Sequence, residues 1–368
     1  MKILITGGHL APALAVIEEI KATRPDTEII FVGRKYSLDS EKTISLEYKE
    51  MERRKILFVP LQAGRLTRVL SIKSLRSFFR VPLGFYRAFF IVKDFQPDII
   101  FSFGGYLALP IVFWASIFKK PIFTHEQTIN PGTANKIIAR FAKKIFVAFE
   151  STKRHFPNDK TIVTGNPLRK SAFKIIKRPL IINKNKPVIY ITGGSLGSHS
   201  INVHIEQIIL KLVKDFIVIH QTGDTKEYQD FEKLQEIKNS LTKDNSERYI
   251  LVKHFFETEI GYIYSLSDLV IGRAGANTFF ELLQLKIPAI FIPLPWSSGR
   301  EQQHHAEIFA RNGIGEIFHQ IETSDKLYRL IVKMIKNIDY YRDNFKSLSY
   351  LTKKNASQYI VNEIFKNN

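Results

Sequence analysis

The chemistry in this sequence is concentrated where glycines and polar residues directly follow apolar runs. Gly7-Gly8-His9 follows the apolar run 2–6. Glycines let a phosphate approach the backbone closely, and the N-terminus of a following helix favours its negative charge. His9 adds a group whose pKa lies near working pH, so it could serve as a general base. A tight turn with a capping histidine is the alternative, and the GxGxxG dinucleotide fingerprint is absent here.

A second glycine-rich turn, GGSLGS at 193–198, follows the apolar run 188–192. Its backbone N–H groups and the Ser195 hydroxyl could hold a diphosphate. A turn that merely needs glycine is the alternative. No lysine of the Walker type follows, which argues against ATP hydrolysis.

His125-Glu126-Gln127 follows the predicted strand 121–124 and offers two groups suited to proton transfer. A metal site is not predicted, because HExxH needs a second histidine four residues on. His304-His305 is interpreted as the solvated start of a helix and not as a pair of metal ligands.

The stretch 268–303 reads as a complete ligand-binding unit of an α/β sheet. It predicts a strand at 268–272, a turn of small residues, a helix from Thr278 with Glu281 in its first turn, and a strand near 287–293. Ligands bind beyond the carboxyl ends of strands in such sheets. Gly275 and Ala276 would form the floor of a nucleotide pocket, and Glu281 would grip the diol of a sugar.

Apolar runs and helical patterns alternate along the chain, which predicts parallel sheets covered by helices. The predicted fold class is α/β, with two Rossmann-like, doubly wound domains facing across a cleft. The first domain would span 1–165, the Lys-, Asn- and Pro-rich stretch 166–186 would be a linker, and the second domain would span 187–351. A last helix at about 352–366 could pack back on the first domain.

Composition limits the classes of protein. A length of 368 residues suggests two domains, and an apolar fraction of 45% is ordinary for a globular chain. The absence of cysteine excludes disulfides and thiolate metal sites and fits a reducing compartment. No signal peptide is expected at the start. The uncharged run 99–118 is long enough to span a bilayer, but Gly104-Gly105 and Pro110 favour a buried strand, turn and helix.

The net charge of +19 is unevenly distributed. Residues 1–200 carry 33 Lys and Arg against 14 Asp and Glu, whereas the remainder is balanced at 21 against 21. This asymmetry indicates an anionic partner for the first part, either nucleic acid or an anionic membrane surface. A lysine-rich genome composition is the alternative explanation.

The basic segment 65–93 contains seven Lys and Arg, no acidic residue, and many interleaved aromatic and aliphatic residues. Such a segment suits the surface of an anionic membrane, and RNA is the alternative because aromatic rings stack on bases. No nucleic-acid-binding signature accompanies it, so the membrane is favoured and nucleic acid is not predicted. An internal helix with a basic outer face remains a further alternative. The residues predicted to face the membrane are Arg68, Lys73, Arg76, Phe78, Phe79 and Arg80.

Taken together, the motifs resemble the MurG family of N-acetylglucosaminyltransferases, glycosyltransferase family 28. The resemblance covers most of the chain and rests on the order and spacing of several segments. They are TGGHLAPALA (6–15), FGGYLALP (103–110), HEQ and PGTANK (125–136), TGNPLR (164–169), GGSLGSHSIN (193–202), HQTG (220–223), GRAGANTFFE (272–281) and EQQ (301–303).

The resemblance implies a GT-B glycosyltransferase that inverts the anomeric carbon and needs no cofactor or tightly bound metal. It implies transfer of GlcNAc from UDP-GlcNAc to the 4-hydroxyl of the muramoyl unit of lipid I, which gives lipid II. Such an enzyme serves peptidoglycan synthesis, cell wall biogenesis, cell shape, cell division and the cell cycle. It would lie peripherally on the cytoplasmic face of the cell inner membrane, with cell-wall synthesis proteins as further partners.

The resemblance also implies roles for individual residues. His9 or Glu126 would be the catalytic base. The predicted UDP-GlcNAc-binding residues are Thr6, Gly7, Gly8, Thr128, Arg169, Ser195, Phe256, Ala276, Asn277, Thr278, Phe279, Phe280, Glu281 and Gln302. Within this set Phe256 would use its backbone toward the uracil, Glu281 would bind the ribose hydroxyls, and Gln302 would lie near GlcNAc.

The sequence departs from the family pattern at three places. Leu4-Ile5 stand where the family has two further glycines, Thr128 replaces an Asn whose amide would contact GlcNAc, and His305 replaces another Asn. Two other functions share the predicted architecture. One is a UDP-GlcNAc 2-epimerase-like enzyme, which would not need the basic segment, and the other is a non-catalytic UDP-sugar-binding membrane adaptor.

Overall fold

The computed structural model describes residues 1–38, 41–62, 72–194, 196–225, 227–348, 353 and 355–366. At 37–38, 41–43, 72–80, 298 and 347 the description covers the backbone alone. The chain divides into two compact units: unit 1 comprises Met1–Arg169 with Lys353–Asn368, and unit 2 comprises Lys170–Thr352.

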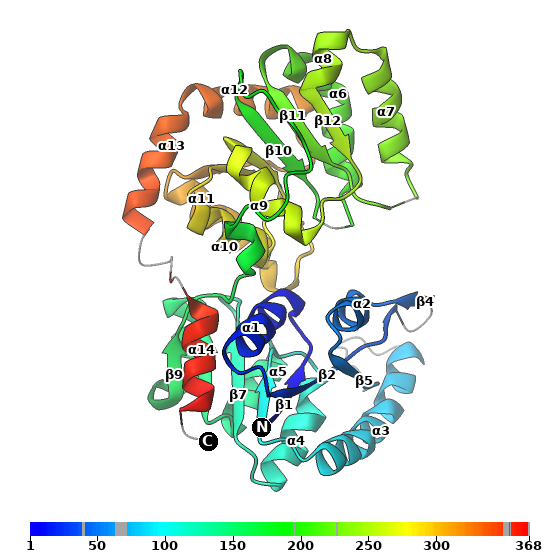
Figure 1. The fold of residues 1–368 in the computed structure, drawn as a ribbon, viewed down its shortest axis with the longest axis vertical. Coiled ribbons are helices and arrows are strands. Elements are labelled where there is room, and N and C mark those ends of the chain that lie inside the picture. The colour runs from blue at the N-terminus through cyan, green and yellow to red at the C-terminus, as the bar shows by residue number, and fades with distance from the viewer. Residues whose placement is uncertain are drawn as a thin grey trace. The chain divides into compact units, whose positions relative to one another are not determined.

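Unit 1 is built from strands and helices in alternation (Figure 1). In chain order its elements are β1 (Lys2–Thr6), α1 (Leu10–Thr23), β2 (Glu28–Gly33), β3 (Tyr36–Leu38), β4 (Glu41–Ile44), α2 (Leu46–Arg53), β5 (Leu57–Pro60), α3 (Ile72–Phe95), β6 (Ile99–Ser102), α4 (Ala108–Ile117), β7 (Ile122–Glu126), α5 (Thr133–Phe141), β8 (Lys144–Val147), the 3₁₀ helices η1 (Glu150–His155) and η2 (Asn158–Lys160), β9 (Thr161–Val163) and α14 (Ala356–Phe365).

The seven-stranded sheet of unit 1 has the order β5-β2-β1-β6-β7-β8-β9, and its paired strands are parallel. Successive residues of β1 point to opposite faces. Ile3 and Ile5 join the core beneath α1 and α14, whereas Leu4 joins the core beneath α3, α4 and α5. Because both faces are covered, the strands read as continuous apolar runs in the sequence.

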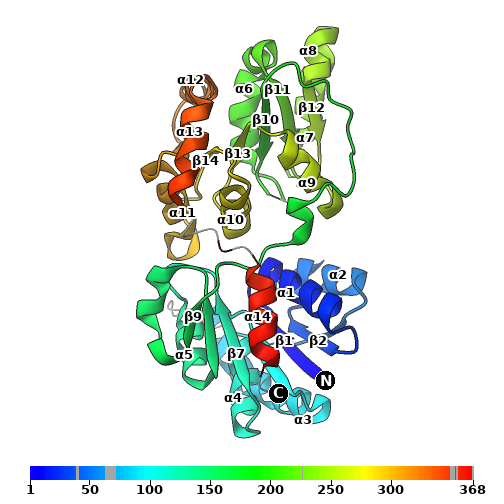
Figure 2. The ribbon, with the colours of Figure 1, turned by 60° about the vertical axis from the view of Figure 1, so that its left-hand side comes forward.

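The last helix of the chain completes unit 1. α14 lies beside α1 in Figures 1 and 2, and its Ile360, Val361 and Ile364 are buried in the core shared with α1. Lys144 at the start of β8 forms an ion pair with Glu363 of α14. Apolar burial and this charge pair therefore hold the C-terminal helix on the N-terminal sheet.

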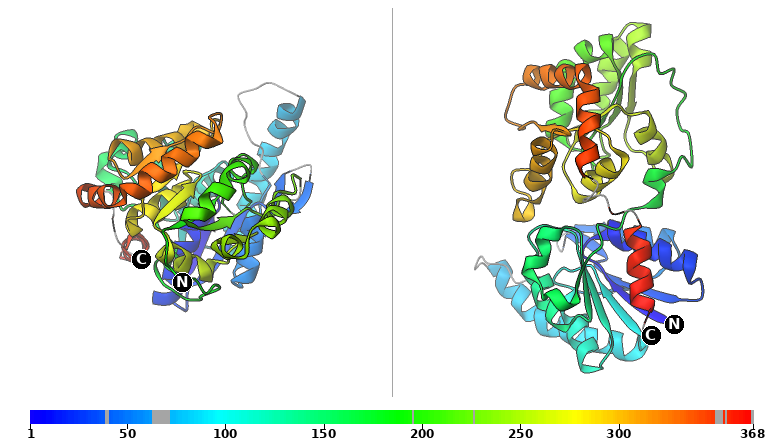
Figure 3. Two further views of the ribbon diagram at one scale, coloured as in Figure 1. Left: turned by 90° about the horizontal axis from the view of Figure 1, so that it is seen from above. Right: turned by 90° about the vertical axis from the view of Figure 1, so that its left-hand side faces the viewer.

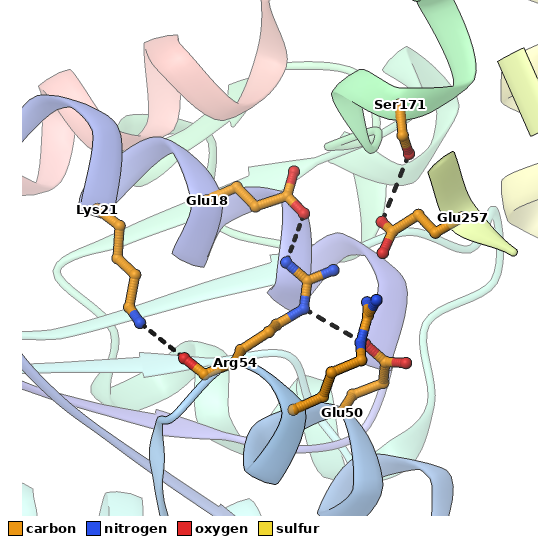
Figure 4. A network of polar contacts seen from close by, with 7 residues as sticks. Glu18, Lys21, Glu50, Arg54, Ser171 and Glu257 are labelled. Atoms are coloured by element: carbon orange, nitrogen blue, oxygen red, sulfur yellow. Dashed lines mark hydrogen bonds and ion pairs between the residues drawn. The ribbon is translucent and has the colours of Figure 1, made fainter. Parts of the chain in front are cut away.

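A polar network fastens α2 to α1 (Figure 4). Arg54 places Nη1 2.6 Å from Glu18 Oε1 of α1 and Nε 3.3 Å from Glu50 Oε2 of α2. Lys21 Nζ donates to the Arg54 carbonyl at 3.0 Å. The side chains of Arg54, Glu18 and Glu50 are largely shielded from solvent, so their ion pairs orient α2 more firmly than exposed pairs would.

Unit 2 repeats the alternation. Its elements are the 3₁₀ helix η3 (Lys170–Phe173), β10 (Val188–Thr192), α6 (His199–Asp215), β11 (Ile217–Gln221), α7 (Asp230–Ser240), α8 (Lys243–Arg248), β12 (Tyr249–Val252), α9 (Glu257–Leu266), β13 (Leu269–Gly272), α10 (Ala276–Leu285), β14 (Ala289–Phe291), the 3₁₀ helix η4 (Ser298–Arg300), α11 (Glu301–Arg311), β15 (Gly315–Ile317), α12 (Ser324–Lys336), α13 (Ile338–Asn344) and the 3₁₀ helix η5 (Phe345–Leu348).

The six-stranded sheet of unit 2 has the order β12-β11-β10-β13-β14-β15 and is parallel throughout its described pairs. Counted within the unit, this is the 3-2-1-4-5-6 order of a Rossmann sheet, and the sheet of unit 1 begins in the same way. Figure 3 shows α12 and α13 (orange) along one side of unit 2, and α12 packs on α6. The predicted fold class of two doubly wound domains is confirmed.

The stretch 166–186, predicted as a linker, is attached to unit 2 from Lys170 onward. Ser171 of η3 donates to Glu257 Oε1 at 3.4 Å (Figure 4), and Lys177 Nζ donates to Glu259 Oε1 at 2.7 Å. A Cβ at Gly261 would lie 2.2 Å from the Lys174 carbonyl, so only glycine lets this stretch lie directly on α9.

Candidate functional site

In unit 1 the strand order reverses between β1 and β6, which is where open α/β sheets bind ligands. The loops that follow these strands touch each other. Gly8 has φ of +155°, and a Cβ there would lie 2.6 Å from the carbonyl oxygens of Phe103 and Gly104. Glycine at Gly8 is therefore required by the close approach of the two loops, and this approach brings His9 to the switch point.

β7 ends at Glu126, two residues later than the sequence suggested, so His125 and Glu126 belong to the strand and are buried. His125 Nε2 lies 3.2 Å from the Gly165 carbonyl. Burial lowers the pKa of His125 to about 3, although its contact with the Gly165 carbonyl acts in the opposite direction. His125 is thus a neutral structural donor, since it lacks the accessible, titrating ring that catalysis would need.

His9 is the N-cap residue of α1 and is half-buried. Its Nδ1 lies 2.7 Å from Gln127 Nε2, which joins the first loop to the end of β7. Burial lowers the pKa of His9, and the nearby carboxylate of Glu126 partly opposes this shift. The imidazole is therefore neutral near pH 7, which is the form that a general base requires.

Glu126, the rival base, is surrounded by donors. Thr128 N–H and Thr128 Oγ1 each lie 2.8 Å from its Oε1, and Asn135 Nδ2 lies 2.7 Å from its Oε2. These contacts engage both carboxylate oxygens. They suit a fixed negative charge beside His9 better than a group that must collect a proton from substrate. Thr128 is thereby used to hold Glu126.

Glu47 of α2 reaches the first glycine loop. Its Oε2 accepts the Arg34 N–H at 3.0 Å, and the Gly8 N–H also donates to this carboxylate. Cβ atoms at Gly7 and Gly33 would lie 2.8 and 2.7 Å from its oxygens, so both glycines make room for the group. Burial raises the pKa of Glu47, and the two backbone donors oppose the shift.

Several polar atoms at this edge are buried without a hydrogen-bond partner in the described structure. They are Thr6 Oγ1, Gln127 Oε1, Asn135 Oδ1 and both amide atoms of Asn166. Buried polar groups are nearly always satisfied, so such a cluster indicates a polar ligand or bound water. The carboxyl edge of unit 1 is therefore a candidate site for a hydroxyl-rich substrate.

In unit 2 the corresponding loop follows β10. Gly197 has φ of +80°, and a Cβ there would lie 1.9 Å from the Thr222 carbonyl, so the loop packs tightly on the end of β11. Gln221 ties three loops together, because its Nε2 donates to the Gly194 carbonyl at 3.0 Å and its Oε1 accepts the Phe255 N–H at 3.1 Å. The glycine loop is thus held by a neutral, buried amide.

Arg273, directly after β13, reaches from the stretch 268–303 to the glycine loop after β10. Its Nη2 donates to Ser198 Oγ at 2.8 Å and to Ser200 Oγ at 2.7 Å, and its Nη1 donates to the Ile292 carbonyl at 2.8 Å. Burial lowers its pKa to about 10, so the guanidinium stays charged. A half-buried cation bonded to neutral oxygens beside a glycine loop is suited to an anionic ligand.

Helix α10 begins at Ala276, directly after Gly275, so Glu281 lies in its second turn and not in its first. Asn277 and Thr278 are half-buried at this N-terminus, whereas Phe279 and Phe280 are buried behind it. Glu281 is almost fully buried, and its Oε2 accepts the Tyr264 hydroxyl at 2.9 Å. The N–H groups of a helix's first turn have no partner within the helix, so this N-terminus is suited to an anion.

The interpretation of His305 as a solvated residue is wrong. It is fully buried, stacks on Phe279 with ring centroids 4.4 Å apart, and places Nδ1 2.9 Å from the Ala274 carbonyl. Burial lowers its pKa to about 4. His305 therefore supports the turn before α10 from within the core. The sequence pattern, two adjacent histidines in a polar helix, does not indicate this role.

The remaining predicted residues have varied positions. Gln302 is half-buried and its Oε1 accepts the Leu294 N–H at 3.0 Å. The Phe256 ring is 66% exposed, and its backbone N–H and carbonyl are both bonded to Glu259. Arg169 is half-buried at the end of unit 1. Ser195 and Arg68 lie outside the described residues, as do the side chains of Lys73, Arg76, Phe78, Phe79 and Arg80.

Two features are absent from the described residues. No helix among them is long and apolar enough to cross a membrane. They also contain no cluster of three or more His, Cys, Asp or Glu arranged to hold a metal ion.

Comparison with protein families gives matches over both units. The model described as "Glycosyltransferase family 28 N-terminal domain" matches residues 6–147, and "Glycosyltransferase family 28 C-terminal domain" matches residues 188–361. The chain belongs to glycosyltransferase family 28. It is therefore a glycosyltransferase, as the motifs predicted.

Curated relatives within family 28 match over most of their length. A protein of Bacillus thuringiensis subsp. konkukian is 31% identical over 373 residues, which cover 99% of both chains. One of Treponema denticola is 35% identical over 324 residues, covering 85% of this chain and 81% of the relative. Both are named UDP-N-acetylglucosamine--N-acetylmuramyl-(pentapeptide) pyrophosphoryl-undecaprenol N-acetylglucosamine transferase, the first with the number 2.

Solved structures agree with the family 28 fold. MurG of Acinetobacter baumannii is 22% identical with a TM-score of 0.69 over the whole of both chains. UDP-GlcNAc 2-epimerase of Neisseria meningitidis is 16% identical with a TM-score of 0.64, also over both whole chains. At these identities the likeness establishes the architecture alone.

The predicted residue set omitted five residues that organise this family 28 chain. They are Glu47, Gln127, Asn135, Gln221 and Arg273. All but Glu47 lie in the family motifs. A polar residue just after a predicted strand was the available signal for Gln127, Gln221 and Arg273, whereas Asn135 lies on α5 and had none. Glu47 had no such signal, because it is on a short helix after a hairpin that the alternation of strands and helices did not predict.

Proposed function

We propose that this chain transfers N-acetylglucosamine from UDP-GlcNAc to the 4-hydroxyl of the muramoyl unit of lipid I, with inversion, to form lipid II. The observation that carries the proposal is the match to transferases of that name over nearly the whole of both chains. The two carboxyl edges support it, since one holds a neutral histidine and the other holds a half-buried guanidinium and the N-terminus of α10.

The acceptor reaction belongs to unit 1. The acceptor hydroxyl attacks C1 of GlcNAc while the bond from C1 to the diphosphate breaks, and the hydroxyl proton passes to His9. His9 fits this role because it is neutral near pH 7 and half-exposed at the switch point. Glu126 would stabilise the resulting imidazolium, since its carboxylate lies close enough to raise the pKa of His9.

The departing UDP belongs to unit 2. Negative charge grows on the diphosphate as the bond to C1 breaks, and donors already in position lower that barrier. The glycine loop after β10, Arg273 and the first turn of α10 supply such donors. Glu281 would bind the ribose hydroxyls, which requires its carboxylate to accept bonds beyond the one from Tyr264.

Unit 1 also carries a surface suited to an anionic membrane. Six apolar residues of α3 and the α4 end are between 36% and 62% exposed: Leu83, Tyr86, Phe90, Phe113, Ile117 and Phe118. We call these the α3–α4 patch. Trp114 Nε1 donates to the Phe85 carbonyl at 2.7 Å, which joins the two helices beneath it. Figure 3 shows α3 (cyan) along the outer side of unit 1.

The α3–α4 patch is bordered by the cations Arg87, Lys93, Lys119 and Lys120, and Lys93 Nζ lies 5.5 Å from the centre of the Phe89 ring. Exposed apolar area flanked by cations is the arrangement that binds anionic lipid surfaces. This supports a peripheral location at the membrane that contains the lipid acceptor. Cell-wall synthesis proteins are proposed as further partners through that shared location.

The direct test is a transfer assay with radiolabelled UDP-GlcNAc and a lipid I analogue, with other UDP-sugars as competitors. We expect labelled disaccharide product to form and UDP-GlcNAc to be the preferred donor. Formation of UDP-N-acetylmannosamine without acceptor would instead identify an epimerase-like enzyme. UDP-GlcNAc binding with neither reaction would identify the non-catalytic adaptor.

Membrane binding is tested separately by sedimentation with anionic liposomes. The double variant Tyr86→Ser with Ile117→Ser should lose most of its lipid-bound fraction, because it removes two exposed apolar side chains from the patch. Tyr340→Ser with Leu210→Ser is the matched control, since these residues of unit 2 are 62% and 55% exposed. Equal binding by both variants would count against the α3–α4 patch.

A further inference from the structure

Gln127 is the direct neighbour of the proposed base. It follows β7, is 7% exposed, and its amide lies 2.7 Å from His9 Nδ1. Neither the family resemblance nor the comparisons assign it a role. The inference below rests on the proposed function, in which His9 accepts the proton of the acceptor hydroxyl.

The contact constrains which nitrogen of His9 can act as base. A neutral imidazole carries one proton, so one nitrogen donates and the other accepts. Gln127 occupies Nδ1, which leaves Nε2 to face substrate. For Nε2 to accept a proton, the proton of the neutral ring must already reside on Nδ1. Gln127 must then present an acceptor, its Oε1, to Nδ1–H.

The surroundings of the amide bear on its orientation. When the amide nitrogen of Gln127 faces His9 Nδ1, the amide oxygen Oε1 is buried without a partner in the described structure. The oxygen and nitrogen of an amide are assigned from their hydrogen bonds, and a half-turn exchanges them. That half-turn places Gln127 Oε1 on His9 Nδ1 and turns the amide nitrogen into the position that the oxygen occupied. It gives Oε1 a donor and leaves the lone pair of His9 Nε2 free.

We propose that Gln127 is a positioning residue that selects the Nδ1–H tautomer of His9, so that Nε2 can accept the acceptor proton. The amide oxygen also holds the ring in place and accepts the Nδ1–H bond of the imidazolium that forms. Among the described residues, the titratable groups that interact with this ring are Glu126, which favours the imidazolium, and the buried, neutral His125. Gln127 thus performs with a neutral amide what a carboxylate does in other base–orienter pairs.

The proton balance of the step is complete. The O–H bond of the acceptor breaks as its oxygen forms the new bond to C1, and the proton moves to His9 Nε2. The electrons of the bond from C1 to the diphosphate leave with UDP. Gln127 gains and loses nothing, and the ring returns its proton to solvent after the product departs.

Two variants test this role. Gln127→Met keeps the length of the side chain and removes both polar atoms, so we expect kcat to fall about 10- to 100-fold, part of the range of general base catalysis. The KM for UDP-GlcNAc should be unchanged. Gln127→Glu supplies only acceptor oxygens and a charge, so it should keep turnover at alkaline pH and move the acidic limb of the pH profile upward. Gln235→Met on α7 is the control.

The deciding readout is the tautomer of His9, measured by ¹⁵N NMR of histidine-labelled protein at pH 8 and assigned with His9→Asn. The wild type should show a protonated Nδ1 and a bare Nε2, and Gln127→Met should lose that preference. A wild type with a protonated Nε2, or a Gln127→Met protein with an unchanged tautomer, overturns the inference. So does a Gln127→Met protein whose UDP-GlcNAc affinity falls as much as its kcat.

This readout separates the inference from the proposed function. The NMR measurement needs no lipid acceptor, so it tests the role of Gln127 even if the acceptor is not lipid I. Conversely, normal turnover by His9→Ala would show that His9 is not the base. The proposed acceptor chemistry would then fail, whichever tautomer Gln127 selects.

Discussion

The two units of this glycosyltransferase each place a glycine loop after their first strand, but they secure that loop with opposite chemistry. The loop of unit 1 receives the carboxylate of Glu47, and a second carboxylate, Glu126, lies near His9. The loop of unit 2 is held by the neutral amide of Gln221 and faces the guanidinium of Arg273. The same backbone device is therefore braced by different side-chain chemistry in the two units.

Charge around each loop explains the division of labour. The Glu126 carboxylate near His9 favours the imidazolium, so the edge of unit 1 is suited to receiving a proton. A half-buried cation beside free N–H groups favours a diphosphate, so the edge of unit 2 is suited to a leaving group. Glycine motifs alone do not distinguish these roles, whereas the side chains that brace them do.

The largest effect is expected from His9→Ala, which removes the proposed proton acceptor from unit 1. Turnover should fall by about two to four orders of magnitude, while the Kd for UDP should stay the same because the donor edge is untouched. Steady-state kinetics and titration calorimetry measure the two quantities. His319→Ala, an exposed histidine of unit 2, is the control. Near-normal turnover would transfer the base role to Glu126 and weaken the contrast between the edges.

The second prediction concerns His305, a buried histidine near the donor edge that has a structural role. Its pKa in the folded protein is lowered to about 4 by burial, whereas an unfolded histidine titrates near 6.5. The unfolded chain thus binds the extra proton first. Stability is full above about pH 6.5 and is lost as pH falls toward 4, by about 3 kcal/mol for this group.

His305→Asn should therefore reduce the loss of stability between pH 6.5 and 4 by that amount while keeping turnover at pH 8. Urea unfolding at a series of pH values measures it, and His319→Asn, an exposed histidine of unit 2, is the control. An unchanged pH dependence would show that His305 does not remain neutral in the folded state.

The sequence was sufficient for the fold because both sheets are buried on both faces. Val188–Thr192 and Leu269–Gly272 appear as plain apolar runs bounded by glycine turns, and such runs identify parallel strands. Strand ends were harder to place. His125 and Glu126 are polar, so the pattern predicts a loop there, whereas their backbone pairing with Phe146 and Val147 of β8 makes them part of β7.

The site was predictable as a set of motifs and not as a set of contacts. His9 and Gln127 lie 118 positions apart, and only the order β1-β6-β7 brings their loops together. The sequence predicts Arg273 only as part of a turn of small residues, because its partners Ser198 and Ser200 lie far away in the chain, at the start of α6. Side chains that brace a loop from a distance leave no local pattern, so their role requires the structure.

The third prediction tests the donor edge. Arg273→Met keeps the length of the side chain but removes the cation and its bonds to the glycine loop. The affinity for UDP should weaken by about 1–3 kcal/mol, the cost of losing a charged hydrogen-bond donor. Arg311→Met, whose side chain is 79% exposed, is the control in calorimetry. An unchanged UDP affinity would mean that Arg273 braces the fold and does not define an anion site.

The smallest effect is expected from Glu47→Gln, which tests whether the loop of unit 1 needs an anion. Burial raises the pKa of Glu47 above its unfolded value. Its contribution to stability is therefore greatest in acid and declines as pH rises through the folded pKa. The glutamine does not titrate, so relative to wild type the variant should gain stability over that window, by about 1 kcal/mol or less. A loss of stability at pH 8 in urea unfolding would show that the negative charge itself holds the N–H groups of Gly8 and Arg34. The loop of unit 1 would then need an anion, whereas the loop of unit 2 is held by the neutral amide of Gln221.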